Sequence, residues 1–175
     1  MDEATRRPAV APITGGPEGY RRKIAELSAN EGPTFFHLAA QLPKEGRTDT
    51  MFAASQTMTV ILKTYAATGE NELHRHPAED HVFVVLDGEA EFYGPAGEVR
   101  RVGKYDGVFV PTTAYYCFRA VGDDPLVMLR VGAKTDPADE GGIWTRTDKL
   151  DQPTPGLYKG QPNVETVLYE DRVFG

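Results

Sequence analysis

Cysteine and long hydrophobic runs are almost missing from this sequence. Cys117 is the only cysteine among 175 residues, which excludes a framework of disulfides within the chain. No apolar run approaches the roughly 20 residues of a membrane-spanning helix. The opening stretch, MDEATRRPAVAPITGG, also lacks the apolar core of a secretion signal. We therefore expect a cytoplasmic protein without a membrane span.

Positive charge is scarce as well. The sequence contains 19 lysines and arginines and 26 aspartates and glutamates, which gives a formal net charge of -7 at pH 7. This balance argues against nucleic acid or an anionic membrane surface as a partner. The length suits one domain with arms and is sufficient to bury a hydrophobic core.

The first 50 residues are predicted to form an arm with one short helix. Residues 1–16 are rich in proline, glycine and alanine. In residues 17–33, PEGYRRKIAELSANEGP, apolar side chains recur at helical spacing, and the final Gly-Pro pair predicts the end of a helix.

Residues 51–133 change to short β-rich runs separated by turn residues such as LDGE, GPAGE and VGDDP. Many short strands without helices between them are typical of a β-sandwich or barrel. The strands are expected at residues 58–66, 81–93, 107–111, 115–121 and 125–133.

The last segment, residues 134–175, is mostly loop by composition. Residues 164–174, VETVLYEDRVF, could add a strand or a docking segment. We expect this extension to pack on the barrel or on a partner protomer.

The octet HRHPAEDH, residues 74–81, holds three of the four histidines of the chain. His74 and His76 are two residues apart, so on a strand both imidazoles face the same side. A third imidazole from a neighbouring strand would complete a three-nitrogen site that suits Zn, Fe, Cu, Ni or Co. The alternative is a polar surface loop.

Two stretches resemble the motifs of the cupin superfamily. Residues 69–88, GENELHRHPAEDHVFVVLDG, are similar to the first motif, and residues 103–120, GKYDGVFVPTTAYYCFRA, are similar to the second. The resemblance implies an all-β fold, the double-stranded β-helix or jelly-roll barrel, with a metal inside that is bound by residues of facing strands.

The resemblance also suggests the third ligand. Counting back from the closing Gly88 by the family spacing gives His81, whereas counting forward from His76 allows Asp80 or His81. We favour the set His74, His76 and His81, with Glu79 and Asp80 facing solvent or lying behind the ligands. The alternative that Glu79 or Asp80, and not His81, is the third metal ligand stays open.

The second motif departs from the family, because Tyr116 stands where the family has its histidine. A phenol is a poor ligand unless a cation converts it to a phenolate. Tyr116 is therefore predicted as a catalytic proton donor beside the metal, with roles as an unusual ligand or as a core side chain left open.

Three further side chains could contact a substrate. Lys63 and Tyr65 share one face of a strand, although such residues more often point outward. Arg130 could recognise a carboxylate.

These patterns predict a metal-dependent cupin enzyme that acts on a small organic molecule. The cofactor is one divalent transition metal ion (Fe, Zn, Cu, Ni or Mn), with Fe or Zn favoured. A dioxygenase-type oxidoreductase is the leading function, and the alternatives are a metal-dependent lyase or isomerase and a non-catalytic ligand-binding cupin. Open sheet edges and irregular arms also predict a homodimer.

Overall fold

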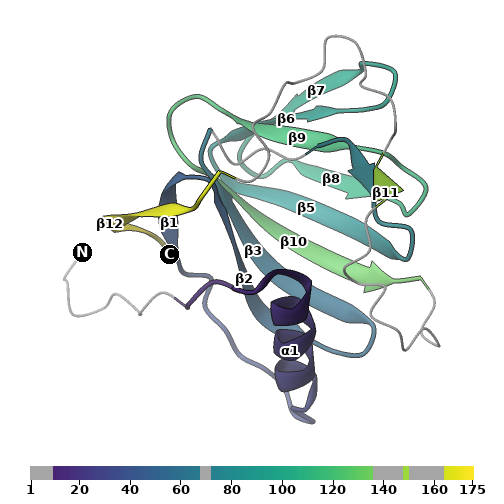
Figure 1. Ribbon diagram of the computed structural model, residues 1–175, viewed down its shortest axis with the longest axis vertical. Coiled ribbons are helices and arrows are strands. Elements are labelled where there is room, and N and C mark those ends of the chain that lie inside the picture. Colours follow the sequence, from purple (N-terminus) through teal and green to yellow (C-terminus); the bar gives the residue numbers. More distant parts are fainter. Residues whose placement is uncertain (1–9, 68–71, 136–147, 150–163) are drawn as a thin grey trace.

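The computed structural model describes residues 10–67, 72–135, 148–149 and 164–175. Its larger sheet has five antiparallel strands, and only one pair of neighbours, β2 and β3, is consecutive in the chain (Figure 1). In spatial order these strands are β2 (Arg47–Ala54), β3 (Met58–Tyr65), β10 (Leu126–Lys134), β5 (Glu79–Asp87) and β8 (Gly107–Val110).

A three-stranded sheet faces the larger one, and two strand pairs lie at the margins. The small sheet contains β7 (Val99–Val102), β6 (Glu89–Tyr93) and β9 (Cys117–Val121). The pairs are β1 (Ala40–Glu45) with β12 (Val167–Phe174), and β4 (His74–Arg75) with β11 (Asp148–Lys149). The predicted all-β jelly-roll barrel is confirmed.

Aromatic and aliphatic side chains of the two sheets fill the space between them. The ring of Tyr65 meets the ring of Phe118 edge to face, with centroids 4.9 Å apart. Loss of one such buried side chain typically costs about 2–5 kcal/mol. The buried members of this core include Phe83, Val85, Phe92, Phe118, Leu126 and Met128.

The inner face of the large sheet changes from apolar to polar along its strands. On β5, the inward-facing position next to the apolar Phe83 is occupied by the polar His81. On β10, the inward-facing Met128 and Arg130 show the same change from apolar to polar. The strand register pairs His81 with Gly132. The polar end of the barrel therefore contains the histidines, and the apolar end contains the core.

The single helix among the described residues, α1 (Gly16–Ser28), packs against β2 and is too short and polar to cross a membrane. The hydroxyl of Tyr20 forms a hydrogen bond with the Asp49 carboxylate on β2. The other oxygen of Asp49 accepts a hydrogen bond from Lys63 Nζ at 2.6 Å. The helix is thereby linked to a charged pair on the inner face of the sheet.

The segment expected to be an arm contains more regular structure than its helix. Strands β1 and β2 lie within or across residues 1–50, and the helix ends at Ser28, before the Gly-Pro pair. The β2 sequence, RTDTMFAA, carries polar side chains on both faces, which hides its alternation. Thr48 is buried nevertheless, because its hydroxyl is paired with that of Thr64 at 2.6 Å.

Among the described residues, the β1–β12 pair covers one end of the outer face of the large sheet. There, Leu62 and Val127 pack with Leu42 and other residues of the β1–β12 pair. At the uncovered end, cross-strand pairing forms an apolar row in which Phe109 is 63% exposed and Val82 is 39% exposed. The row consists of Phe109, Val82, Val131 and Val60.

Candidate metal centre

Strand β5 places Glu79 and His81 on the same side of the sheet. The strand begins at Glu79, so alternation directs both side chains inward and Asp80 to the other side. The Asp80 carboxylate accepts a hydrogen bond from the backbone N–H of Thr112 at 2.8 Å. Glu79 is 2% exposed. Of the two placements expected for Glu79, the solvent-facing one is therefore wrong.

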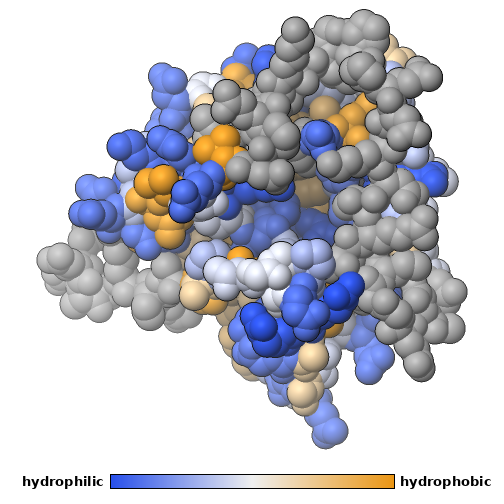
Figure 2. Space-filling model, viewed as in Figure 1, coloured by the Kyte–Doolittle hydropathy of each residue, from blue (hydrophilic) through white to orange (hydrophobic). Residues whose placement is uncertain are grey.

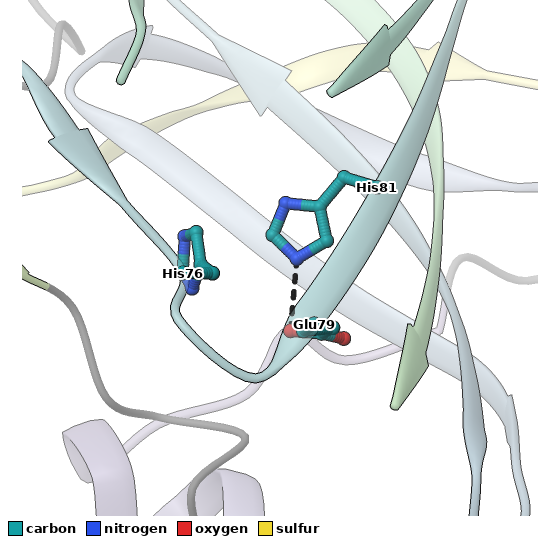
Figure 3. Close-up of side chains that lie close together, drawn as sticks. All are labelled: His76, Glu79 and His81. Atoms are coloured by element: carbon teal, nitrogen blue, oxygen red, sulfur yellow. Dashed lines mark ion pairs between the residues drawn. The ribbon is translucent and has the colours of Figure 1, made fainter. Parts of the chain in front are cut away.

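His76, Glu79 and His81 form one compact group (Figure 3). One ligand atom from each residue lies within 4.8 Å of the other two, and no other group of this kind occurs in the described part of the chain. The imidazole of His76, which follows β4, lies 4.4 Å from that of His81 between ring centroids. Glu79 Oε2 lies 2.8 Å from His81 Nε2.

His74 lies beside this group and is not a member of it. Its backbone forms two hydrogen bonds with that of Tyr116, at 3.0 and 2.9 Å. Its Nδ1 donates to the carbonyl of Glu72 at 2.7 Å, so Nε2 keeps its lone pair. The ring centroid is 5.0 Å from that of His76. The structure thus brings two of the three predicted ligands together with Glu79, and His74 as a ligand stays a prediction.

The three imidazoles are neutral at pH 7. Burial lowers the pKa of His74 to about 4. Burial and the neighbouring His81 lower the pKa of His76 to about 2, and burial with the Arg130 charge lowers the pKa of His81. Neutral imidazoles have the lone pairs that metal binding requires.

Gly132 on β10 makes room for the Glu79 carboxylate. A Cβ atom at position 132 would lie 1.9 Å from Glu79 Oε1, far inside van der Waals contact. The same oxygen accepts a hydrogen bond from the Thr59 hydroxyl at 3.4 Å. The carboxylate is therefore held in a fitted space between β10 and β3.

Arg130, predicted as a side chain that could recognise a carboxylate, contacts one inside the barrel. It is 6% exposed, and its guanidinium contacts both Glu79 and His81. The carboxylate that it contacts belongs to the protein itself. Alternation along β10 places Arg130 on the inner face with Met128.

Tyr116 points into the barrel next to the histidines. Its hydroxyl lies 3.2 Å from His81 Nδ1, and its ring lies 4.8 Å from that of His74. Burial raises the pKa of Tyr116, so the phenol is protonated at pH 7. A protonated phenol at this position is able to donate a proton.

Lys63 and Tyr65 also face inward, contrary to the more common orientation expected for them. They pair across β3 and β10 with Met128 and Leu126, whose side chains belong to the core.

Figure 2 shows the molecular surface hollowed near its centre, with hydrophilic residues inside the hollow.

The residues present fit a divalent transition metal ion. His76 Nδ1 is buried and has no hydrogen-bond partner, although a buried polar atom is normally paired. His76 also has a potential ligand atom within 4.8 Å of the potential ligand atoms of Glu79 and His81. Two imidazoles and one carboxylate are a common donor set for such ions.

Residues 61–132 match the family model described as Cupin domain. This part of the chain is a cupin domain. Similar solved structures include an RmlC-like cupin protein from Desulfovibrio desulfuricans, 22% identical, with 59% of this chain and 97% of that chain covered and a TM-score of 0.49. KdgF from Halomonas sp. is 20% identical, with 60% and 96% covered and a TM-score of 0.49.

A protein with a double-stranded β-helix domain from Klebsiella pneumoniae is also similar, at 20% identity and a TM-score of 0.48, with 55% of this chain and 76% of that chain covered. No curated relative matches the sequence. The cupin domain contains the His76, Glu79 and His81 group, whereas Asp49, the carboxylate partner of Lys63, precedes it.

Proposed function

We propose that the cupin domain is a metal-dependent enzyme that acts on a small organic molecule. One divalent ion, Fe or Zn first, would be held by His76, Glu79 and His81, with His74 as a further candidate ligand. The observation that carries the proposal is the His76 Nδ1 atom, which is buried without a partner in a group of three ligand residues.

The leading reaction class is that of a dioxygenase-type oxidoreductase. Two histidines and a carboxylate with open positions are the donor set of non-haem Fe(II) oxygenases. When bound, the ion supplies open coordination positions for substrate and dioxygen. The aromatic core beside the site, including Phe83 and Phe118, limits the access of water to bound substrate.

Tyr116 would provide the proton chemistry. Its protonated hydroxyl, located beside His81, can donate a hydrogen bond or a proton to a substrate oxygen. Because this role needs no dioxygen, it also favours a second candidate function, a metal-dependent lyase or isomerase acting on a carbonyl compound.

The charges inside the barrel favour an anionic substrate. Lys63 is paired with Asp49, and Arg130 is paired with Glu79, so these four charges cancel. A divalent ion held by neutral imidazoles and this already paired carboxylate adds two positive charges. Uncompensated charge in a buried site is unfavourable, so a carboxylate or an enolate would balance it.

The first test is elemental analysis of protein purified without a histidine tag. We expect about one transition metal ion per chain in the wild type and its loss in His76→Ala and His81→Ala. Asp80→Asn is the matched control, because Asp80 is on the opposite side of β5 and should retain the metal. Full metal occupancy in the His76→Ala/His81→Ala double variant would refute the site.

Turnover assays then separate the reaction classes. Small carboxylates are offered to the metal-loaded protein with and without dioxygen. Turnover coupled to dioxygen consumption supports the oxidoreductase, and equal turnover without dioxygen supports the lyase or isomerase. Binding without turnover in either condition would favour the ligand-binding cupin.

The expected assembly is a homodimer in the cytoplasm, without nucleic acid or membrane as a partner. The uncovered apolar row with Phe109 and Val82 supports self-association, because exposed apolar surface of this kind marks contact surfaces.

A further inference from the structure

A buried guanidinium lies against two of the three ligand residues. Nη2 of Arg130 donates a hydrogen bond to Oε2 of Glu79 and also contacts Nε2 of His81. A guanidinium does not lose its proton in proteins. A permanent positive charge therefore lies beside both ligand atoms.

The contact with Arg130 favours one tautomer of His81. A guanidinium only donates hydrogen bonds, so the Nε2 atom that faces Arg130 presents its lone pair and Nδ1 carries the ring hydrogen. Nδ1 then donates to the Tyr116 hydroxyl at 3.2 Å. The lone pair that faces Arg130 is the one that a metal ion on Nε2 would use.

The distance between the two contacted atoms shows why a cation is needed there. Nε2 of His81 and Oε2 of Glu79 are 2.8 Å apart. Two atoms that present lone pairs at this distance repel each other unless a positive charge lies beside both. Arg130 supplies this charge from β10, whereas the half-buried Lys63 on the same face is paired with Asp49.

We propose that Arg130 and the metal ion compete for Nε2 of His81 and Oε2 of Glu79, so that metal binding displaces the guanidinium from His81. The inference rests on the proposed metal centre. Since an imidazole nitrogen has a single lone pair, Nε2 cannot serve both cations at once. Arg130 is covalently attached to the chain, so it lowers the apparent metal affinity by a constant factor, as any intramolecular competitor does.

The affinity for Zn²⁺, measured by competition with a chromophoric chelator, tests the proposal. Arg130→Met should bind Zn²⁺ at least about tenfold more tightly than the wild type, because the competitor is removed and the ion alone neutralises Glu79. Arg119→Met is the matched control, since Arg119 is paired with Glu91 away from the site, and its affinity should stay within about twofold.

Equal or weaker Zn²⁺ binding in folded Arg130→Met overturns the competition and assigns Arg130 a positioning role. If neither the wild type nor Arg130→Met binds Zn²⁺, the metal centre itself is wrong and the competition fails with it. Zn²⁺ binding by the wild type thus distinguishes failure of the competition from failure of the metal centre.

A second measurement uses the wild-type chain, because Arg130→Met leaves Glu79 without its cation and could fail to fold. ¹⁵N NMR follows the arginine side-chain N–H signals during Zn²⁺ titration. The Arg130 signal, protected from exchange by its buried partners, should lose protection as Zn²⁺ saturates the site, and the Arg119 signal should not change. An Arg130 signal that keeps its protection at saturation overturns the proposal.

Discussion

The imidazole of His81 and the phenol of Tyr116 are hydrogen-bonded inside the barrel, with Nδ1 and the hydroxyl oxygen 3.2 Å apart. This contact joins β5 of the large sheet to the residue just before β9 of the small sheet. In the tautomer favoured by the Arg130 contact, His81 donates its ring hydrogen in this bond, and the hydroxyl hydrogen of Tyr116 is available to another acceptor. A change at Tyr116 therefore separates proton donation from metal binding.

Tyr116→Phe keeps the ring and removes only the hydroxyl. If Tyr116 is the proton donor, metal content should persist while turnover falls by roughly a hundred- to ten-thousand-fold. If it is a ligand, metal content should fall too. Tyr93→Phe is the control, because the Tyr93 hydroxyl is bound to Glu91. Unchanged metal content and turnover in Tyr116→Phe would leave only a role in the core.

Gly132→Ala should displace the Glu79 carboxylate, because the added Cβ would overlap Oε1. We expect weaker Zn²⁺ binding and a loss of about 1–3 kcal/mol in the free energy of unfolding, from chelator competition and urea titration. Gly107→Ala is the control, since its nearest contact would be the Phe83 carbonyl at 3.5 Å. Unchanged Zn²⁺ affinity in Gly132→Ala would argue that Glu79 is not a ligand.

Mild acid should destabilise the metal-free protein. The pKa of His74 is about 4 in the folded chain, and those of His76 and His81 are lowered as well. The unfolded chain therefore binds more protons below its own histidine pKa of about 6.5. The free energy of unfolding should fall as pH drops from 6.5 toward 4, by up to about 1.4 kcal/mol per pH unit for each histidine.

Urea titrations at several pH values measure this slope. His74→Ala should reduce it, because burial lowers the pKa of His74, and His37→Ala, which removes an exposed histidine, is the matched control. A slope in His74→Ala equal to that of the wild type would mean that His74 is not held neutral by the fold.

The uncovered row on the large sheet should support the homodimer. Light scattering at micromolar concentration should give twice the chain mass, and Phe109→Asp should give a monomer, because a carboxylate would enter an apolar contact. Tyr105→Asp is the control, since Tyr105 is 79% exposed outside this row. A monomeric wild type would contradict the prediction.

Strands with β-branched and apolar runs were predictable from the sequence. Residues 58–66, 107–111 and 125–133 correspond to β3, β8 and β10, and Gly88 has the positive φ, 74°, of the turn that ends β5. β7 was not predicted, because Val99–Val102 contains two arginines and forms an exposed edge of the small sheet. Its hydrogen-bonded pairing with β6 stabilises the strand, although its composition does not favour one.

The site was predictable in part, because spacing identifies strand faces and does not identify contacts across strands. Alternation from His81 back to Glu79 would have placed this carboxylate inside, but counting by the family motif passed over it. The contact of Arg130 with Glu79 depends on the pairing of β10 with β5. That pairing joins distant parts of the chain, and no local pattern encodes it.

The side-chain contacts from Tyr20 to Asp49 and from Asp49 to Lys63 show that the matched segment does not form the whole structural unit. Tyr20 and Asp49 both precede the matched segment, residues 61–132, yet Asp49 neutralises a lysine inside it. A fragment cut at residue 61 would keep the lysine, lose its counter-charge and strip β2 from the edge of β3. Helix α1 and strand β2 thus belong structurally to the barrel, and any transplant of this site into a smaller scaffold must include them.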